Sequence, residues 1–270
     1  MPRDMQSSVH GKVLLVGAGP GPADLLTLRA ARAIGAADAV LYDALVSLEV
    51  LDLAPPRCLR IQTGKRAGKA SIPQDTINRL MRRLARRGLT VVRLKGGDPA
   101  VFGRVGEEKA FLQAHGVAVE IVPGITAASA AAAQFGFPLT HRGEARRLLV
   151  STATVKANMG DGGAALDHGW AAAADAETTL ALYMGRDQIA GVADRLIAAG
   201  RAPSTPAIAI ENAGAPHARA IAAPLAALPA ALAAAAPTGP VVILVGEVTA
   251  QAERVVAPIP MPQPLQGARA

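Results

Sequence analysis

A strand-like segment in the first half of the chain ends in residue types that can bind a ligand. Arg93 and Lys95 close an apolar run that starts at Val91, and residues 96–99, Gly-Gly-Asp-Pro, follow at once. Glycines let a ligand lie directly against the main chain, whereas aspartate and proline fix the turn that follows. An amphipathic segment over residues 104–114 comes next. The pattern predicts a strand, a tight loop and a helix, with the loop where open parallel sheets bind ligands, although a plain turn would show the same spacing.

Four further loops follow predicted strands and carry residues that could do chemistry. They lie at Gly17, Asp43, Lys65 and Thr126. If the strands are parallel, right-handed connections place all five loops at one edge of the sheet, as one wall of a single cleft. Three of these loops also have an ordinary interpretation, because Asp43 and Thr126 suit helix caps or turns and the basic loop around Lys65 suits a solvated turn.

The loop from Gly17 to Gly21 nearly matches the glycine fingerprint of dinucleotide-binding proteins. The third glycine of that fingerprint would fall at position 22, which is Pro22, and position 20 is also a proline. Prolines lack the N–H groups that hold a pyrophosphate at the start of a helix. We therefore do not expect an NAD-dependent dehydrogenase, and nicotinamide binding would be needed to revive that interpretation.

Composition and periodicity predict an α/β protein with two domains. Of the 270 residues, 51% are hydrophobic and only 3% aromatic, so the core must consist mainly of Ala, Val, Leu and Ile. Strand and helix patterns alternate in the first half, and the second half is richer in strands. We predict a disordered N-terminus over residues 1–10, α/β domains over 11–142 and 143–250, and a disordered tail over 251–270.

The same composition excludes several classes of protein. No apolar run is long enough to span a membrane, and the polar first ten residues are unlike a secretory signal. A single cysteine, Cys58, leaves no internal disulfide and no multi-cysteine metal site. We expect a cytoplasmic protein without a metal or a membrane partner.

The net charge of +7 raises the question of a nucleic-acid partner. Much of the excess belongs to the polar face of one predicted helix, which carries Arg79, Arg82, Arg83, Arg86 and Arg87. A solvated helix face explains this charge, and no interleaved aromatic residues offer a stacking surface for bases. We expect no nucleic-acid partner, and a polyanionic small molecule remains a candidate ligand.

A series of motifs occurs in one order over nearly the whole chain, from Gly11 to Val248. They are Val-Gly-Ala-Gly-Pro-Gly (16–21), Leu-Tyr-Asp-Ala-Leu-Val-Ser (41–47), Gly-Lys-Arg-Ala-Gly (64–68), Arg-Leu-Lys-Gly-Gly-Asp-Pro (93–99), Val-Phe-Gly-Arg (101–104), Val-Pro-Gly-Ile-Thr-Ala-Ala (122–128), Pro-Leu-Thr-His-Arg (138–142), Tyr-Met-Gly (183–185) and Glu-Asn-Ala (211–213). In this order they resemble the uroporphyrinogen-III C-methyltransferases, which are tetrapyrrole methylases. The chain is similar to the stand-alone form of these enzymes and not to the fused sirohaem synthase.

The resemblance implies the tetrapyrrole methylase fold, in which an active-site trough lies between two α/β domains, and a homodimer. It implies an enzyme that converts uroporphyrinogen III to precorrin-2 in sirohaem or cobalamin biosynthesis. Two methyl groups would pass from S-adenosyl-L-methionine to adjacent pyrrole rings, leaving S-adenosyl-L-homocysteine. By the same resemblance, Asp43 would accept a proton and Lys65 would donate one. The cofactor would contact Pro20, Gly96, Gly97, Asp98, Val101, Thr126, Ala127, Met184 and Ala213.

The basic residues suit such a substrate. A porphyrinogen carries many carboxylates, with which arginine pairs well. We therefore predict substrate contacts from Arg66, Lys95, Arg104 and Arg142, in a cleft that also holds Lys65, Lys69 and Arg93. The reacting pyrrole carbon is already electron-rich and the sulfonium methyl is activated, so the protein mainly has to align the two and move protons.

Two segments depart from the family pattern and keep alternatives open. Residues 21–24 read Gly-Pro-Ala-Asp where the family often has Gly-Asp-Pro-Glu, and residues 151–156 replace a Thr-Gly-His segment. The second departure is compatible with a catalytically impaired binding protein. A methylase of a later corrin precursor is a further alternative, although Arg-Leu-Lys-Gly-Gly-Asp-Pro argues against it. A related ribosomal RNA methylase would need the arginine-rich helix as its RNA surface.

Overall fold

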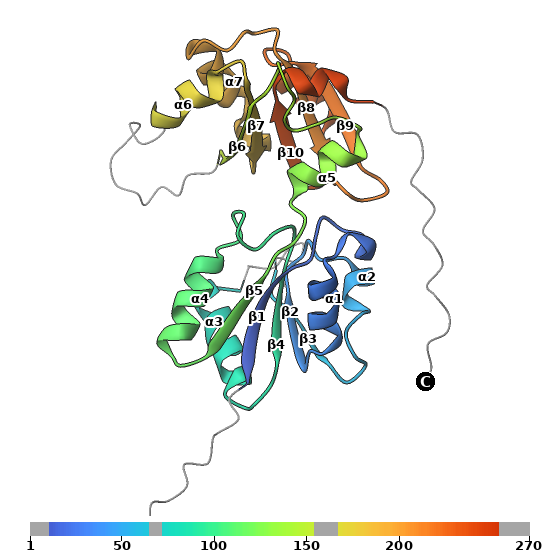
Figure 1. Ribbon diagram of the computed structural model, residues 1–270, viewed down its shortest axis with the longest axis vertical. Coiled ribbons are helices and arrows are strands. Elements are labelled where there is room, and N and C mark those ends of the chain that lie inside the picture. The colour runs from blue at the N-terminus through green and yellow to red at the C-terminus, as the bar shows by residue number, and fades with distance from the viewer. Residues whose placement is uncertain (1–10, 65–71, 154–166, 254–270) are drawn as a thin grey trace, which may run out of the picture.

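The computed structural model describes residues 11–64, 72–153 and 167–253 (Figure 1). These residues form two lobes, each built around a five-stranded sheet. The predicted α/β class is therefore confirmed. The predictions for residues 1–10 and for most of the tail lie outside the described residues.

Sheet 1, in the N-terminal lobe, is entirely parallel and has the strand order β3-β2-β4-β1-β5. Its strands are β1 (Lys12–Gly17), β2 (Ala39–Tyr42), β3 (Leu59–Gln62), β4 (Val91–Lys95) and β5 (Ala118–Val122). The central strands β1 and β4 are almost continuously buried, as expected for strands covered on both faces. Because all neighbours are parallel, the loops that follow the five strands emerge at one edge, as the sequence predicted.

Helices cover both faces of sheet 1. Successive side chains of β1 alternate between the faces, so that Leu14 joins the core beside α1 (Leu28–Gly35) and α2 (Leu48–Leu51). Leu15 joins the opposite core beside α3 (Gln74–Ala85) and α4 (Val105–Ala114). The arginine-rich helix is α3, and its predicted apolar face is buried at Ile77, Met81 and Leu84.

Sheet 2, in the second lobe, is mixed and has the order β6-β7-β10-β8-β9. Only β6 and β7 are parallel neighbours; the other pairs are antiparallel. The strands are β6 (Arg147–Thr152), β7 (Thr178–Tyr183), β8 (Pro206–Glu211), β9 (Arg219–Pro224) and β10 (Val241–Val245). One face packs against α7 (Ile189–Ala198) and α8 (Leu228–Ala235), with α6 (Asp167–Ala174) alongside α7.

The opposite face of sheet 2 is covered by α5 (Ala127–Gln134), which follows β5 of sheet 1 directly in the sequence. Ala128 and Ala131 of α5 share a buried cluster with Ile208 and Val242 of sheet 2. The small alanine side chains let the helix lie close to the sheet. The domain boundary predicted after residue 142 stays a prediction, but α5 lies before it in the sequence and packs with the second lobe.

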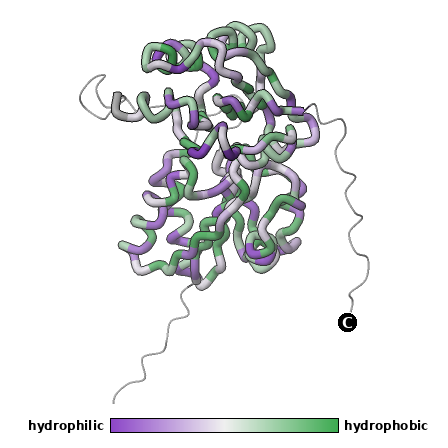
Figure 2. Tube along the Cα trace, turned by 45° about the horizontal axis from the view of Figure 1, so that its top comes forward, coloured by the Kyte–Doolittle hydropathy of each residue, from purple (hydrophilic) through white to green (hydrophobic). Residues whose placement is uncertain are grey.

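The two lobes differ in the hydropathy of their residues. Figure 2 shows hydrophilic residues more often along the lobe of sheet 1 than along that of sheet 2, in keeping with the alanine-rich second half. Among the residues that the structure describes, no helix combines the length and the apolar character needed to cross a bilayer.

Candidate functional site

The loops after β1, β4 and β5 stack on one another through glycines. The Gly97 N–H donates to the Gly19 carbonyl at 2.7 Å, and the Gly19 N–H returns a bond to the Gly97 carbonyl at 3.2 Å. A Cβ on Gly124 would collide with the Gly97 carbonyl oxygen and lie 2.9 Å from the Gly17 Cα. These obstacles are backbone atoms that cannot turn away, so the stacking of the loops depends on the missing side chain.

Asp98 fixes this stack with its carboxylate. Its Oδ1 accepts from the Ala100 N–H at 2.7 Å, which forms the turn predicted for Asp98 and Pro99. Its Oδ2 accepts from the Gly124 N–H at 2.9 Å and so joins the loops after β4 and β5. The carboxylate thus orients two loops whose backbones line the same edge.

Tyr183, at the end of β7, connects the second lobe to this edge. Its hydroxyl lies 2.6 Å from the Thr126 hydroxyl and accepts from the Ala128 N–H at 2.9 Å. The Tyr183 ring also lies 5.4 Å, between centroids, from the ring of Phe102 in the loop before α4. Thr126 occupies the N-cap position of α5 without capping it through its side chain. The cap therefore comes from the other lobe, a role for which the sequence offered only the Tyr-Met-Gly motif.

Strained backbone gathers around the same edge. Non-glycine residues with positive φ include Phe102 (53°), Arg104 (57°), Met184 (53°) and Asn212 (54°). Such conformations cost on the order of 1–3 kcal/mol each and persist where the surroundings enforce them, often at ligand sites. The side chains of Met184 and Phe102 are 51% and 40% exposed although both are apolar. Exposed apolar side chains on strained backbone are typical of a surface that a ligand covers.

The loop after β8 completes this group of residues. Gly214 packs so closely on Pro20 that a Cβ would lie 2.6 Å from the proline side chain. Gln134 of α5 clamps the same loop, since its Oε1 accepts from the Gly214 N–H and its Nε2 donates to the Ala215 carbonyl, each at 2.8 Å. The neighbouring Ala213, a predicted cofactor residue, is thereby held near Pro20.

The structure thus brings together the predicted cofactor residues from both halves of the chain. Pro20 packs on Gly214 and is preceded by Gly19, which pairs with Gly97. The Gly97 loop contacts the loop of Gly124 and Thr126, and the Thr126 hydroxyl contacts Tyr183, which precedes Met184. Val101 lies within the same turn, because its N–H donates to the Asp98 carbonyl at 3.1 Å. The cofactor contacts themselves remain predictions.

Of the predicted catalytic pair, one member lies among the described residues. Asp43 follows β2 at the same edge, is half-buried and accepts from the Leu45 N–H at 3.1 Å through Oδ1. Gly64 packs on it, since a Cβ at Gly64 would lie 2.9 Å from the Asp43 Cα. Gly64, the last described residue after β3, therefore lies directly beside Asp43, whereas Lys65 and Arg66 lie outside the described part of the chain.

The predicted substrate-binding cations occupy different environments. Lys95 is only 6% exposed, and its Nζ lies 3.0 and 3.1 Å from the two carboxylate oxygens of Glu108. Burial lowers the pKa of Lys95, while Glu108 opposes this shift. This placement argues against a direct contact between Lys95 and a substrate. Arg104 and Arg142 are exposed, and Arg104 pairs with Glu107 at 2.6 Å.

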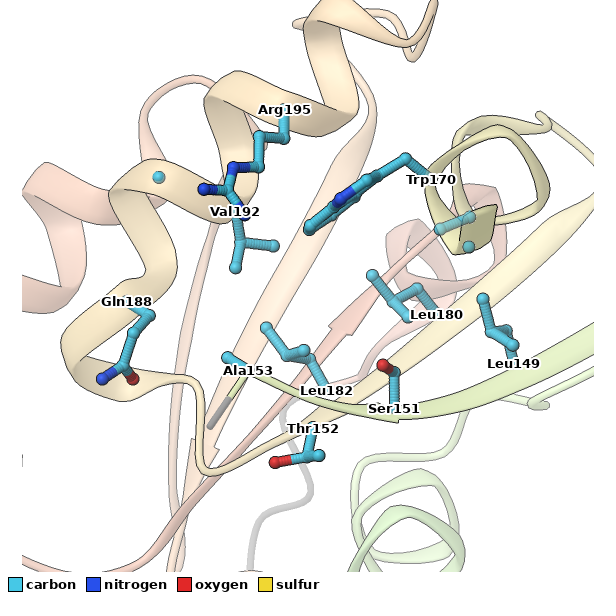
Figure 3. A pocket seen from close by; sticks show the side chains of 13 residues that line it. Leu149, Ser151, Thr152, Ala153, Trp170, Leu180, Leu182, Gln188, Val192 and Arg195 are labelled. Atoms are coloured by element: carbon cyan, nitrogen blue, oxygen red, sulfur yellow. The ribbon is translucent and has the colours of Figure 1, made fainter. Parts of the chain in front are cut away.

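A cavity of about 620 Å³ lies elsewhere, in the second lobe between sheet 2 and α6 and α7 (Figure 3). Its lining is mainly apolar, with Leu149, Leu180 and Leu182 on the strands and Trp170 and Arg195 on the helices. The Arg195 guanidinium lies 5.9 Å from the centre of the Trp170 ring. None of the predicted site residues lines this cavity. Within the described residues, no group of three or more His, Cys, Asp or Glu side chains could hold a metal ion.

Comparison with known proteins identifies similar sequences. Residues 12–229 match the family described as Tetrapyrrole (Corrin/Porphyrin) Methylases. The chain is 45% identical to the uroporphyrinogen-III C-methyltransferase of Paracoccus denitrificans, over 90% of this chain and 83% of that protein. It is 46% identical to the enzyme of the same name from Pseudomonas aeruginosa, over 89% and 95%. A siroheme synthase of Xylella fastidiosa is 45% identical over 94% of this chain, which spans only 53% of that protein.

Solved structures agree with these relatives. The uroporphyrin-III C-methyl transferase of Thermus thermophilus, complexed with S-adenyl homocysteine, superposes with a TM-score of 0.71 at 40% identity, covering 88% of this chain and 93% of that one. A cobalt precorrin-4 methyltransferase superposes with a TM-score of 0.78 at 28% identity, covering 92% and 98%.

Proposed function

The chain belongs to the tetrapyrrole methylase family, and we propose that it converts uroporphyrinogen III to precorrin-2 by two successive methyl transfers from S-adenosyl-L-methionine. The observation that carries this proposal is the joining of the stacked glycine loops of sheet 1 to Tyr183 and to the Ala213 loop of the second lobe. It is supported by relatives named for this activity that the chain covers over most of their length.

The residues at the edge of sheet 1 fit the methyl donor. The missing side chains at Gly17 and Gly124 let three loops lie together, and Gly97 adopts a φ of 69° that favours glycine. The apolar side chain of Met184 is half-exposed beside them. We assign the cofactor to Pro20, Gly96, Gly97, Asp98, Val101, Thr126, Ala127, Met184 and Ala213. When bound, it supplies a methyl group activated by a positively charged sulfur.

Asp43 is the proposed proton acceptor. Methylation of a pyrrole carbon is accompanied by proton loss, which a positioned carboxylate can assist. The Leu45 N–H orients the Asp43 carboxylate at the same edge as the cofactor loops. Lys65, which we propose as the proton donor, comes directly after Gly64, the residue that packs on Asp43.

The exposed cations Arg104 and Arg142 suit the carboxylates of uroporphyrinogen III and of the precorrin intermediates, as does Arg66 by sequence. For Lys95, burial against Glu108 favours a structural role instead. A homodimer in the cytoplasm is the assembly and location that the family resemblance implies.

The test is an anaerobic incubation of the purified protein with uroporphyrinogen III and S-adenosyl-L-methionine, followed by absorbance and mass spectrometry. A product two methyl groups heavier supports the proposal, and absence of methyl transfer despite cofactor binding refutes it. Asp43→Asn should lower turnover while affinity for S-adenosyl-L-homocysteine stays within about twofold, because Asp43 moves a proton and does not hold the cofactor.

Methylation of a later corrin precursor is the second candidate function. It is favoured by the TM-score of 0.78 to the cobalt precorrin-4 methyltransferase, whereas the identity of 28% to that protein, against 40% to the Thermus enzyme, favours uroporphyrinogen III. Parallel incubation with a precorrin carrying more methyl groups separates the two.

A further inference from the structure

Three charged side chains are buried together beneath the loop edge of sheet 1. Arg93 and Lys95 of β4 are 5% and 6% exposed, and Glu108 of α4 is fully buried. The Arg93 Nε lies 3.4 Å from the Glu108 Oε1, and the Lys95 Nζ is within 3.1 Å of both carboxylate oxygens. Gln74, in the first turn of α3, donates to the same Oε1 at 2.9 Å. The Glu108 carboxylate of α4 therefore holds two cations from β4 and an amide from α3.

Such a network is poorly explained by stability alone. Removing charges from water is costly, and apolar side chains of similar size often replace a buried ion pair without loss. The best-attested use of buried ionic groups is to fix the register of neighbouring elements. The contacts at the far end of Arg93 show which elements would be fixed here.

The Arg93 guanidinium reaches the ends of three adjacent strands. Its Nη1 donates to the Thr63 hydroxyl after β3 at 3.0 Å and to the Leu94 carbonyl of β4 at 3.1 Å, and it lies 3.5 Å from the Leu41 carbonyl of β2. The Thr63 hydroxyl in turn donates to the Tyr42 carbonyl at 3.0 Å, and the Thr63 N–H donates to the same oxygen at 2.8 Å. One planar side chain thus spans the point where three strands become loops.

These three loops carry the proposed chemistry. Tyr42 is followed by Asp43, Thr63 by Gly64 and Lys65, and Lys95 by the first glycine of the cofactor loop. Arg93 is too deeply buried to contact the substrate itself, so the earlier expectation that it lies in the substrate cleft does not fit its position.

We propose that Arg93, anchored by Glu108, is a positioning residue that sets the spacing between the Asp43 loop and Thr63 and Gly64, the residues that follow β3. The Thr63 hydroxyl is the link through which it acts. The inference rests on the proposed function, because Asp43 is the residue proposed to accept a proton in that reaction.

Thr63→Val tests the link, with Thr63→Ser as the matched control. Valine keeps the shape of threonine but removes the acceptor that links Arg93 to the end of β3, whereas serine keeps the hydroxyl and loses only a methyl group. We expect Thr63→Val to lower kcat about tenfold, with KM for S-adenosyl-L-methionine and affinity for S-adenosyl-L-homocysteine within about twofold. Thr63→Ser should retain most of the turnover. Arg93→Lys, which keeps the charge but loses the planar fork, should resemble Thr63→Val.

A second measurement does not depend on activity. Hydrogen exchange of the segment 41–47, which contains the Leu45 N–H bonded to Asp43, should be faster in Thr63→Val and unchanged in Thr63→Ser. The proposal is overturned if the valine and serine variants behave alike, or if cofactor affinity falls in proportion to kcat, which would show a general loss of structure. If the unaltered protein transfers no methyl group, the proposed function fails and the exchange rates alone decide whether Arg93 positions the loops.

Discussion

Tyr183→Phe removes a single oxygen atom from the junction between the two lobes. That oxygen accepts from the Ala128 N–H at 2.9 Å and lies 2.6 Å from the Thr126 hydroxyl. The first N–H groups of a helix have no partner within the helix, and Thr126 does not cap α5 with its side chain. Losing a cap costs about 1 kcal/mol, and losing the hydrogen bond to Thr126 costs about 1 kcal/mol more.

We therefore expect the free energy of unfolding to fall by about 1–2 kcal/mol. For a chain of this size, each kcal/mol lowers the melting temperature by roughly 2–4 °C. Affinity for S-adenosyl-L-homocysteine should fall as well, because Thr126 and Met184 are proposed cofactor residues next to the lost bonds. Thermal unfolding with and without S-adenosyl-L-homocysteine measures both effects.

Tyr42→Phe is the matched control. Tyr42 packs against the core of sheet 1, and among the residues that the structure describes its hydroxyl makes no hydrogen bond. Its removal should leave the melting temperature nearly unchanged. Equal effects of the two substitutions, or no effect of Tyr183→Phe, would refute the assignment of Tyr183 as the cap of α5.

Three further predictions concern other parts of the structure. Gly124→Ala would press a methyl group into the Gly97 carbonyl, so we expect about 1–3 kcal/mol of destabilisation in denaturant titrations and weaker cofactor binding. Gln134→Leu removes the clamp on the Ala213 loop and should weaken S-adenosyl-L-homocysteine binding several-fold by calorimetric titration. Hydrogen bonds, chiefly from the Gly239 N–H, lower the pKa of Glu211 below its ordinary 4.5. The stability that this carboxylate contributes is therefore complete above pH 4.5 and is lost as the pH falls through the lower pKa of the folded state. Glu211→Gln should make the free energy of unfolding less dependent on pH in this acidic range.

Local signals in the sequence were sufficient to predict which segments form the strands of sheet 1 and, for a parallel sheet, the edge at which their loops emerge. Buried apolar runs such as Val91 to Leu94 are typical of parallel strands, and glycines or prolines after them mark the loops. Parallel strands leave little freedom in where those loops emerge, so the common edge followed from the strand assignments. The turn formed by Asp98 and Pro99 could be predicted for the same reason, because it depends on adjacent residues.

Contacts between distant segments could not be predicted in this way. Lys95 looks like a surface cation beside two glycines, and only the packing of α4 on β4 shows that Glu108 meets it in the core. Tyr183 caps a helix more than fifty residues earlier in the chain, which no local pattern indicates. The end of the alternating strand and helix pattern likewise placed the boundary between the halves after residue 142, whereas the packing of α5 depends on the complementary surface of sheet 2.

The packing of α5 has a consequence for dividing this protein into fragments. A fragment that ends at residue 142 would carry α5 without sheet 2, and Ala128, Ala131 and Phe135 would be left uncovered. If the N-terminal fragment ends at Pro123 instead, α5 stays in the C-terminal fragment together with sheet 2, which buries it. The boundary along the sequence and the boundary between the packed lobes thus differ. A cut after residue 142 would give an N-terminal fragment whose C-terminal helix exposes an apolar face, and such a face promotes association between molecules.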